Sequence, residues 1–150
     1  MEIDCINSAE PRFTHIRAIR NSVFVQEQGV SPANEFDETD WEALHFLIWR
    51  GGEPIGTARL YGEGGVARIG RVAVLASARG QGAGRALMEK ALAEARRLGY
   101  SEVVIHAQTR VRAFYERLGF DVEGEMYEEE GIPHVSMRRV YQVFASDDGV

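Results

Sequence analysis

The sequence predicts a single α/β domain with a mixed, mostly antiparallel sheet of about seven strands flanked by helices. Three observations support this fold class. Short apolar and β-branched runs separated by glycine pairs are typical of consecutive antiparallel strands. One long amphipathic segment then precedes another β-branched run, as expected of a parallel crossover. The chain has 150 residues, enough for one domain with a buried core.

The first half of the chain predicts a strand, a helix and a three-stranded meander. Residues 2–6 form a short apolar strand, and residues 11–24 form a helix with apolar side chains at helical spacing. The polar segment 25–40 predicts a loop or a broken helix. Three antiparallel strands joined by Gly-Gly turns are predicted at 44–50, 54–62 and 66–75.

The second half predicts a helix, a parallel strand, another helix and a hairpin. Residues 83–98 place apolar side chains on one helical face, with a glycine directly after them as a stop. Residues 102–108 are a β-branched run that a helix-length crossover leaves parallel to the preceding strand. A second helix is predicted over 109–119, and a final hairpin over 120–140.

Composition indicates a soluble protein of a reducing compartment. Of the residues, 45% are hydrophobic and 27% are charged, and the single cysteine, Cys5, has no partner for a disulfide. We expect Cys5 to be a small buried side chain. No basic segment followed by an apolar core begins the chain, and no run approaches the ~18–20 apolar residues of a membrane span, so a cytoplasmic location is expected. The domain is assigned to residues 1–144, with a disordered polar tail at 145–150.

The charge distribution argues against nucleic acid and favours a local anion site. The formal net charge is −6 at pH 7, which would repel a phosphate backbone. Positive charge is nevertheless concentrated at Arg68, Arg71, Arg79 and Arg85, whereas acidic residues gather at 121–130. One part of the surface is therefore expected to attract anions.

The loop at residues 79–85 contains three glycines and two arginines directly before the long predicted helix. Glycine in the first turn of a helix costs about 0.5–1 kcal/mol relative to alanine, so another requirement must favour it. A helix N-terminus has unpaired N–H groups and a partial positive charge, and glycine lets phosphate oxygens approach them. The loop lacks the lysine and hydroxyl of GxxxxGK[ST]. By itself it fits either a phosphate site or a tight turn with solvated arginines.

Two longer segments carry a family resemblance. RVAVLASARGQGAGRALM (71–88) and VRAFYERLGF (111–120) resemble the Gcn5-related N-acetyltransferases, in which R/Q-x-x-G-x-G/A binds the pyrophosphate of coenzyme A. Residues 79–84 fill every position of that motif. FVQEQGV, AQT and GIPHVSM are similar to the ElaA/YjcF-type subgroup in particular. The resemblance covers nearly the whole chain and implies a single GNAT domain that uses acetyl-CoA.

The resemblance also implies where the cofactor lies. If the strand ending near residue 75 splays from the strand at 102–108, its backbone can pair with the amides of pantetheine like an added strand. Gln108 keeps an amide where relatives often carry asparagine, although an exposed polar residue at a strand end is the alternative. The implied cofactor-binding residues are Val72, Ala73, Val74, Arg79, Gly80, Gln81, Gly82, Ala83, Gly84, Arg85 and Gln108.

The sequence specifies the catalytic groups less fully than the cofactor site. Tyr115 occupies the position of a tyrosine that often serves as general acid in this superfamily; the alternative is that it packs the helix. Many relatives have a glutamate base on the fourth strand, where this chain has Gly70. The candidate bases are His134, His45, His106 and Glu27. His134 is preferred because acceptors enter on its side of this fold, and a structural histidine beside a proline turn is the alternative.

The acceptor pocket is assigned to Arg20, Glu27, His45 and Arg71. Two arginines there favour an acceptor that bears a carboxylate or phosphate. The alternative interpretations are solvated surface charges and, for His45, a hydrogen-bonded core histidine.

The expected function is direct, metal-free transfer of an acetyl group from acetyl-CoA to the primary amine of a small molecule. Three alternatives stay open. The missing strand glutamate favours a CoA-binding regulatory module without turnover, the acceptor can instead be a protein amine, and a protein-interaction domain would have no CoA affinity. The identity of the acceptor and the oligomeric state are also open, with a homodimer as the commonest assembly of such domains.

Overall fold

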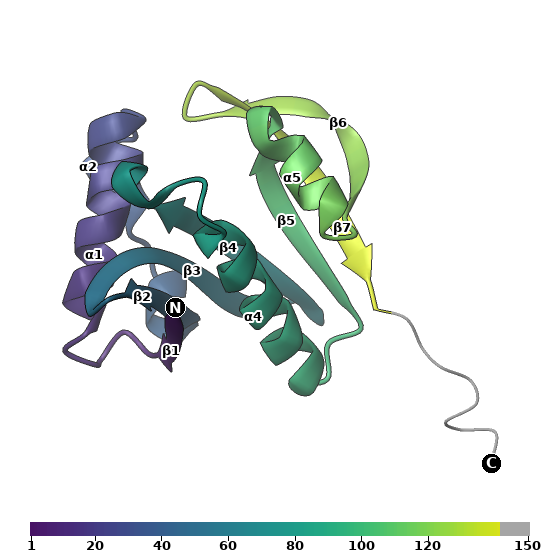
Figure 1. Ribbon diagram of the computed structural model, residues 1–150. Helices are drawn as coiled ribbons and strands as arrows, with labels where there is room; N and C mark the ends of the chain where they lie inside the picture. The colour runs from purple at the N-terminus through teal and green to yellow at the C-terminus, as the bar shows by residue number, and fades with distance from the viewer. Residues whose placement is uncertain (142–150) are drawn as a thin grey trace, which may run out of the picture.

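The computed structural model describes residues 1–141 (Figure 1). The predicted tail at 145–150 and the last predicted domain residues, 142–144, lie outside the described residues. The strands are β1 (Glu2–Ile6), β2 (Leu44–Arg50), β3 (Glu53–Glu63), β4 (Val66–Val74), β5 (Glu102–Gln108), β6 (Asp121–Glu129) and β7 (Ile132–Val140). The helices are α1 (Phe13–Arg20), α2 (Pro32–Glu35), α3 (Thr39–Glu42), α4 (Ala83–Arg97) and α5 (Arg112–Arg117), with the π-helical segment η1 (Asn21–Glu27) and the 3₁₀ turns η2 (Ala76–Ala78) and η3 (Thr109–Val111).

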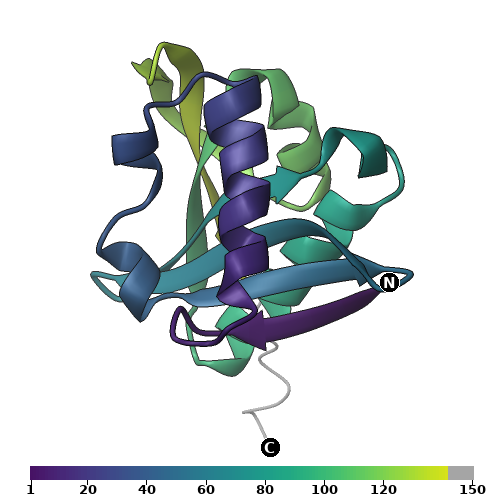
Figure 2. The same ribbon diagram turned by 90° about the vertical axis from the view of Figure 1, so that its left-hand side faces the viewer.

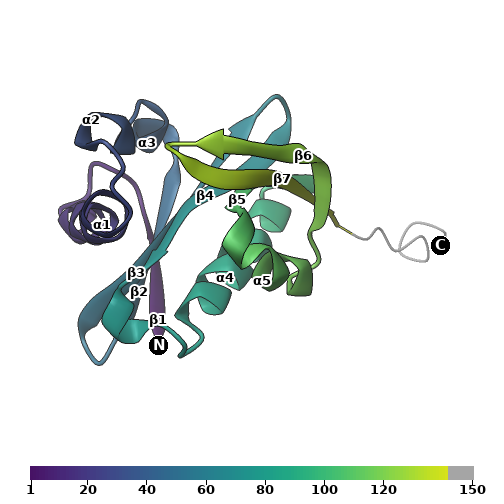
Figure 3. The ribbon, with the colours of Figure 1, turned by 90° about the horizontal axis from the view of Figure 1, so that it is seen from above.

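The seven strands form one mixed sheet in the order β1-β2-β3-β4-β5-β7-β6. Every neighbouring pair is antiparallel except β4 and β5, which are parallel because α4 crosses between them. This confirms the predicted mixed, mostly antiparallel sheet. Figure 3 shows α4 and α5 on one face and α1, α2 and α3 on the other, and Figure 2 shows α1 lying across the strands at the β1 end. No helix within residues 1–141 is long and apolar enough to cross a membrane.

The parallel strands β4 and β5 diverge soon after they pair. Their ladder contains only two positions, Ala67 with Val103 and Arg68 with Val104. Beyond these residues the two ribbons separate toward their carboxyl ends (Figure 1). The second half of β4 therefore has no ladder partner on β5, as the predicted splay requires.

A bulge in β4 bends this second half. The register with β3 pairs Arg59 with Gly70 but Thr57 with Ala73, so β4 has one residue more than β3 between these pairs. Arg71 lies in the bulge with a φ of 50°, a left-handed conformation that is uncommon for a residue with a side chain. The bulge turns the end of β4 away from β5 and helps to open the gap.

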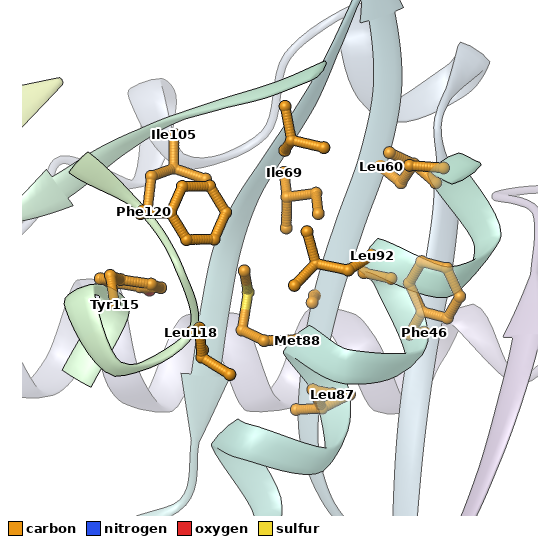
Figure 4. Packing of buried hydrophobic residues seen from close by; sticks show 14 of the residues in the cluster. Phe46, Leu60, Ile69, Leu87, Met88, Leu92, Ile105, Tyr115, Leu118 and Phe120 are labelled. Atoms are coloured by element: carbon orange, nitrogen blue, oxygen red, sulfur yellow. The ribbon is translucent and has the colours of Figure 1, made fainter. Parts of the chain in front are cut away.

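The main core fills the space between α4 and the sheet (Figure 4). Most of the predicted apolar face of α4 is buried, with Ala83, Leu87, Ala91 and Ala95 each no more than 2% exposed, whereas Leu98, directly after the helix, is 48% exposed. Replacing a fully buried leucine such as Leu87 with alanine costs about 2–5 kcal/mol. Packing of this strength holds the N-terminus of α4 in place at the end of β4.

Three local predictions differ from the structure. The helix predicted over 11–24 starts at Phe13 and continues past residue 20 as the π-helical segment η1. The segment predicted as a loop or broken helix contains the short helices α2 and α3. Cys5, predicted to be buried, is exposed because β1 is an edge strand of the sheet.

Candidate active site

A cleft of about 820 Å³ occupies the gap between the diverging halves of β4 and β5. Its lining comes from both sides of the sheet. One end is formed by the loop before α4 and the start of that helix, and the other by α2, the β6–β7 turn and polar residues of β3, β4 and β5. A concave volume of this size is typical of small-molecule sites.

Two glycines shape the end of the cleft next to α4. Gly80 and Gly82 have φ values of 77° and 87°, and Gly82 is the residue that precedes the helix. A Cβ placed on either glycine would meet no atom within 4 Å. The backbone conformation thus favours glycine, and the space above the first N–H groups of α4 is open to an anion.

Three arginines line the same end of the cleft: Arg79, Arg85 and Arg110. Arg79 Nε donates to the Val74 carbonyl oxygen at 3.0 Å, and its two terminal nitrogens bind the Glu27 carboxylate at 2.6 and 2.7 Å. Hydrogen bonding from Arg79 lowers the pKa of Glu27. Arg85 is paired with Glu89 at 2.8 Å, and both this pair and the Arg79–Glu27 pair are solvent-exposed, so a bound anion can displace either carboxylate. With the N-terminus of α4, these arginines suit this end of the cleft to an anion.

Tyr115, on α5, lines the cleft between its two ends and is 9% exposed. Its ring packs edge-on against Phe114 and Phe120, with centroid distances of 5.0 and 6.1 Å. Burial raises the pKa of Tyr115 to about 12, so the phenol keeps its proton at neutral pH. Within residues 1–141, no hydrogen-bond partner is found for its hydroxyl group.

The opposite face of the sheet supplies the other end of the cleft. Ile69 packs toward α4 (Figure 4), so its neighbours Arg68 and Gly70 project to the opposite side of β4. His106 of β5 and His134 of β7 line the cleft with them. A Cβ on Gly70 would meet nothing within 4 Å, which leaves open space beside β4 at the position expected for a strand glutamate.

The hydrogen bonds of His134 define its tautomer. Nδ1 lies 2.7 Å from the carbonyl oxygen of Ile132, which can only accept, so Nδ1 carries the proton. Nε2 lies 3.5 Å from Oε2 of Glu129. The ring also stacks on Tyr127 with a centroid distance of 5.9 Å. A neutral His134 can therefore accept a proton at Nε2 next to a carboxylate.

His106 is held as a neutral ring. Its Nε2 lies 3.3 Å from Nη1 of Arg68, a donor, so Nε2 acts as the acceptor. Nδ1 then donates to the hydroxyl oxygen of Tyr127 at 2.5 Å. Burial and, secondarily, the charge of Arg68 lower the pKa of His106. Both nitrogens are engaged, which makes His106 a weaker candidate base than His134.

A buried ion network supports the wall of the cleft formed by α2. Arg20 binds Oε1 of Glu35 at 2.7 Å and Oδ1 of Asp40 at 2.6 Å, and Arg59 binds the same oxygen of Asp40 at 2.9 Å. Although burial opposes ionisation, hydrogen bonds from Arg20 lower the pKa of Asp40 to about 2. Burial raises the pKa of Glu35 against the attraction of Arg20. Arg71 in the β4 bulge reaches Glu35 Oε1 at 3.5 Å, which ties α2 to the bulge.

Residues 17–141 match the family described as an acetyltransferase (GNAT) domain. The chain belongs to the GNAT acetyltransferase family. The N-acetyltransferase YjcF of Bacillus subtilis is 35% identical over 125 residues, which cover 81% of this chain and 87% of YjcF. ElaA of Escherichia coli is 35% identical over 127 residues, which cover 81% of this chain and 82% of ElaA.

Solved GNAT-type structures share the whole fold. The crystal structure of Escherichia coli ElaA matches with a TM-score of 0.83 and 31% identity, covering 92% of this chain and 98% of that one. An acyl-CoA N-acyltransferase from Pseudomonas aeruginosa matches with a TM-score of 0.84 and 35% identity, covering 93% of this chain and 100% of that one. The resemblance to the ElaA/YjcF-type GNAT enzymes is confirmed, and the acetyl donor of this family is acetyl-CoA.

Most of the residues that the GNAT resemblance assigns to the cofactor lie together. Gln81 does not line the cleft, and its side chain accepts a hydrogen bond from Arg50. Gln108 donates to Gln28 at 2.9 Å and accepts from Arg110 at 3.0 Å, so its side chain reaches from β5 to the end of η1. The predicted cofactor residues that line the cleft are Val72, Ala73, Val74, Arg79, Gly80, Gly82, Ala83, Gly84, Arg85 and Gln108.

Two residues assigned to the acceptor pocket do not reach it. Arg20 is 1% exposed and is bound to Glu35 and Asp40 behind the cleft. His45 is fully buried, its Nε2 lies 2.9 Å from the carbonyl oxygen of Asp40, and burial lowers its pKa. Both side chains belong to the buried network and neither lines the cleft, so the geometry gives neither a contact with an acceptor, and His45 is unsuited to act as the base.

The other two assigned acceptor residues are paired with protein charges. Glu27 does not line the cleft and is bound to Arg79 at its edge. Arg71 does line the cleft, but Glu35 and Asp37 lie 3.5 and 3.9 Å from its guanidinium. Arg71 is therefore an unsuitable basis for predicting an anionic acceptor.

Sequence reasoning missed several residues that line the acceptor end. They come from the segment expected to be a loop, from β3 and from the β6–β7 turn, and they are Asn34, Glu35, Asp37, Arg59, Glu129 and Glu130. A signal existed for Glu129, because the hairpin turn pairs it with Ile132 and so brings it near His134. The residues of α2 gave no signal, because two short helices without periodicity do not fix which side chains face the sheet.

Proposed function

We propose that this protein transfers an acetyl group from acetyl-CoA directly to the primary amine of a small molecule in the cytoplasm. The observation that carries the proposal is the continuous cleft, which joins the positively charged loop before α4 to His134 and is lined by Tyr115. When bound, acetyl-CoA supplies the acetyl thioester. The protein supplies an anion site, a general base and a general acid.

The residues of the first end of the cleft fit coenzyme A. The open space above Gly80 and Gly82 fits a phosphate at the N-terminus of α4, a helix of 15 residues. Arg79, Arg85 and Arg110 offer the charge that a pyrophosphate needs. Backbone groups of residues 72–74 lie beyond the last β5 ladder partner, where an extended pantetheine chain can pair with them like a strand.

His134 is the proposed general base. An amine reaches the site as an ammonium ion and must lose a proton before it can attack a carbonyl carbon. Nδ1 of His134 is fixed as a donor to the Ile132 carbonyl, so Nε2 is the atom that accepts this proton. Glu129, with Oε2 3.5 Å from Nε2, stabilises the imidazolium that results.

Tyr115 is the proposed general acid. Its hydroxyl hydrogen is retained because burial raises the pKa to about 12. The residue lines the cleft between the loop before α4 and the residues of β4. In this proposal the proton on Tyr115 Oη neutralises the thiolate that leaves in the cleft.

Release of the coenzyme A thiol, followed with a thiol reagent over a panel of small primary amines, tests the proposal. We expect release that depends on both the enzyme and an amine, with an acetylated amine as the product in mass spectra. Release with a lysine-containing peptide but with none of the small amines would move the acceptor to the protein class.

A second function, a CoA-binding module without turnover, is favoured by one observation. β4 carries Gly70, with no side chain, at the position where many relatives place a base. This function predicts that acetyl-CoA raises the melting temperature of the protein while no amine releases the thiol.

A further inference from the structure

We infer that the acceptor is an amphoteric amine whose carboxylate or phosphate group binds Arg68 while its ammonium group lies between Glu129 and His134. The inference rests on the proposed function, because it names the class of molecule that enters the acceptor end of the same cleft. Its basis is the charge that remains at this end once the ion pairs of the protein are taken into account.

The other two arginines at the acceptor end are already neutralised. Arg59 is bound to Asp37 and Asp40, each at 2.9 Å, and is only 6% exposed. Arg71 has Glu35 at 3.5 Å and Asp37 at 3.9 Å. A ligand oxyanion would have to displace a buried carboxylate, that of Asp40 from Arg59 or that of Glu35 from Arg71, which leaves an uncompensated charge in the protein.

Arg68 is different. Its nearest carboxylate in residues 1–141 is that of Glu63, at 3.6 Å, and the Glu63 side chain is 66% exposed, so solvent weakens the attraction. Nη1 of Arg68 is engaged by the neutral ring of His106, and its Nε is buried without a hydrogen-bond partner among the described residues. Arg68 thus lines the cleft with a positive charge that no buried carboxylate neutralises, the feature that binds a carboxylate or phosphate.

Negative charge is available at the other side of the same chamber. Glu129 and Glu130 line the cleft at the β6–β7 turn. Glu130 accepts a hydrogen bond from Asn34 at 2.9 Å, and Glu129 lies beside Nε2 of His134. An ammonium group that binds Glu129 is therefore delivered to the proposed base.

A row of three rings joins these two charges. His106 contacts Arg68, Tyr127 receives a hydrogen bond from His106, and His134 stacks on Tyr127. The successive ring centroids are 6.1 and 5.9 Å apart. The cation and the base therefore lie at opposite ends of one short polar wall, as an amine that carries its own anionic group requires.

Binding to the protein saturated with coenzyme A tests the inference apart from turnover. The probes are matched pairs that differ in the anionic group: β-alanine and β-alaninamide, and phosphoethanolamine and ethanolamine, with putrescine as a dication. Isothermal titration calorimetry should show each amine that bears an anionic group binding about tenfold or more tightly than its partner without that group. Putrescine should bind more weakly than β-alanine.

Arg68→Met should abolish this preference while the affinity for coenzyme A stays the same, and Arg68→Lys should retain part of it. Arg117→Met, which removes an exposed charge on α5, is the control for net charge and should keep the preference. Glu129→Gln should weaken the binding of every amine by about tenfold, whereas Glu128→Gln, at the neighbouring exposed position, should leave amine binding unchanged. Circular dichroism checks that each variant is folded.

The outcomes separate the two proposals. If the protein prefers amines that bear an anionic group, loses this preference in Arg68→Met and shows no turnover, the inferred class of ligand is supported and the proposed transferase function is contradicted. Turnover with putrescine or a lysine peptide as the best acceptor, or a preference that persists in Arg68→Met, would overturn the acceptor class and leave the transferase function in place.

Discussion

Glu27 and Arg79 form a bidentate ion pair, with N–O distances of 2.6 and 2.7 Å, between the end of η1 and the loop before α4. Both side chains are 42% exposed, so the pair itself contributes no more than about 1 kcal/mol. A pyrophosphate bound at the loop competes with Glu27 for the same guanidinium. Glu27→Gln is therefore expected to tighten coenzyme A binding about two- to fivefold in low salt, measured by calorimetry.

The matched control for this prediction is Glu94→Gln. It removes an ion pair between Glu94, whose side chain is 17% exposed, and the exposed Arg97 near the far end of α4, and it should leave coenzyme A affinity unchanged. Weaker binding in Glu27→Gln would show instead that Glu27 positions Arg79 for the cofactor.

Gly82→Ala should impair cofactor binding beyond its effect on folding. The φ of 87° makes any side chain costly there, by about 1–2 kcal/mol of unfolding free energy, and the new methyl group projects into the open space above α4. Coenzyme A affinity should fall about tenfold or more. Gly64→Ala, in the β3–β4 turn with a φ of 60° and equally open space, is the control: it should lose similar stability and keep its affinity.

Asp40 makes stability depend on pH in the acid range. Its pKa in the folded protein is about 2, below the ordinary value of 3.8, so its ionisation favours folding above about pH 4 and this contribution disappears as the pH falls toward 2. The difference corresponds to about 2 kcal/mol. Glu35 affects stability in the opposite direction. Because its pKa is raised in the folded protein, its ionisation opposes folding, and its contribution to stability decreases as the pH increases.

Urea denaturation of Asp40→Asn at several pH values measures this contribution. The variant should lose about 3–5 kcal/mol near neutral pH, because Arg20 and Arg59 keep buried charges without their shared carboxylate. Its stability should also change less than that of the unmodified protein between pH 4 and pH 2. Asp121→Asn, at an exposed position of β6, should have neither effect.

A carboxylate on β4 should replace His134 as the base. Gly70 has room for a side chain on the same face of the sheet as His134. Adding Gly70→Glu to His134→Gln is therefore expected to raise the turnover rate about tenfold or more above that of His134→Gln alone. Gly70→Gln in the same background has the same size without a basic group and should recover nothing. Recovery by both residues would indicate that they act through packing.

The fold and the loop before α4 were predictable because their signals are local in the sequence. Helical spacing on α4 and the glycine pairs between strands specify their elements directly. The glycine pattern at 79–84 likewise concerns one loop and one helix end. In each case the residues that form the feature lie within one or two turns of each other along the chain.

The acceptor end depends on pairings that no local pattern specifies. Arg20 was assigned to the pocket, yet its partners Glu35 and Asp40 lie 15 and 20 residues away and hold it in the interior. Arg68 gains its significance only because Arg59 and Arg71 are neutralised by carboxylates of the α2–α3 segment. Charge balance inside a cleft is thus a property of the folded chain.

The most direct test is the rate at which the coenzyme A thiol is released from acetyl-CoA in the presence of a small primary amine, compared between the unmodified protein and Tyr115→Phe. The substitution keeps the buried ring of a residue that lines the cleft and removes only its hydroxyl. We expect amine-dependent release that slows about 10²-fold in Tyr115→Phe, with coenzyme A affinity unchanged. Release that needs no amine, or equal rates in the two proteins, would contradict this expectation.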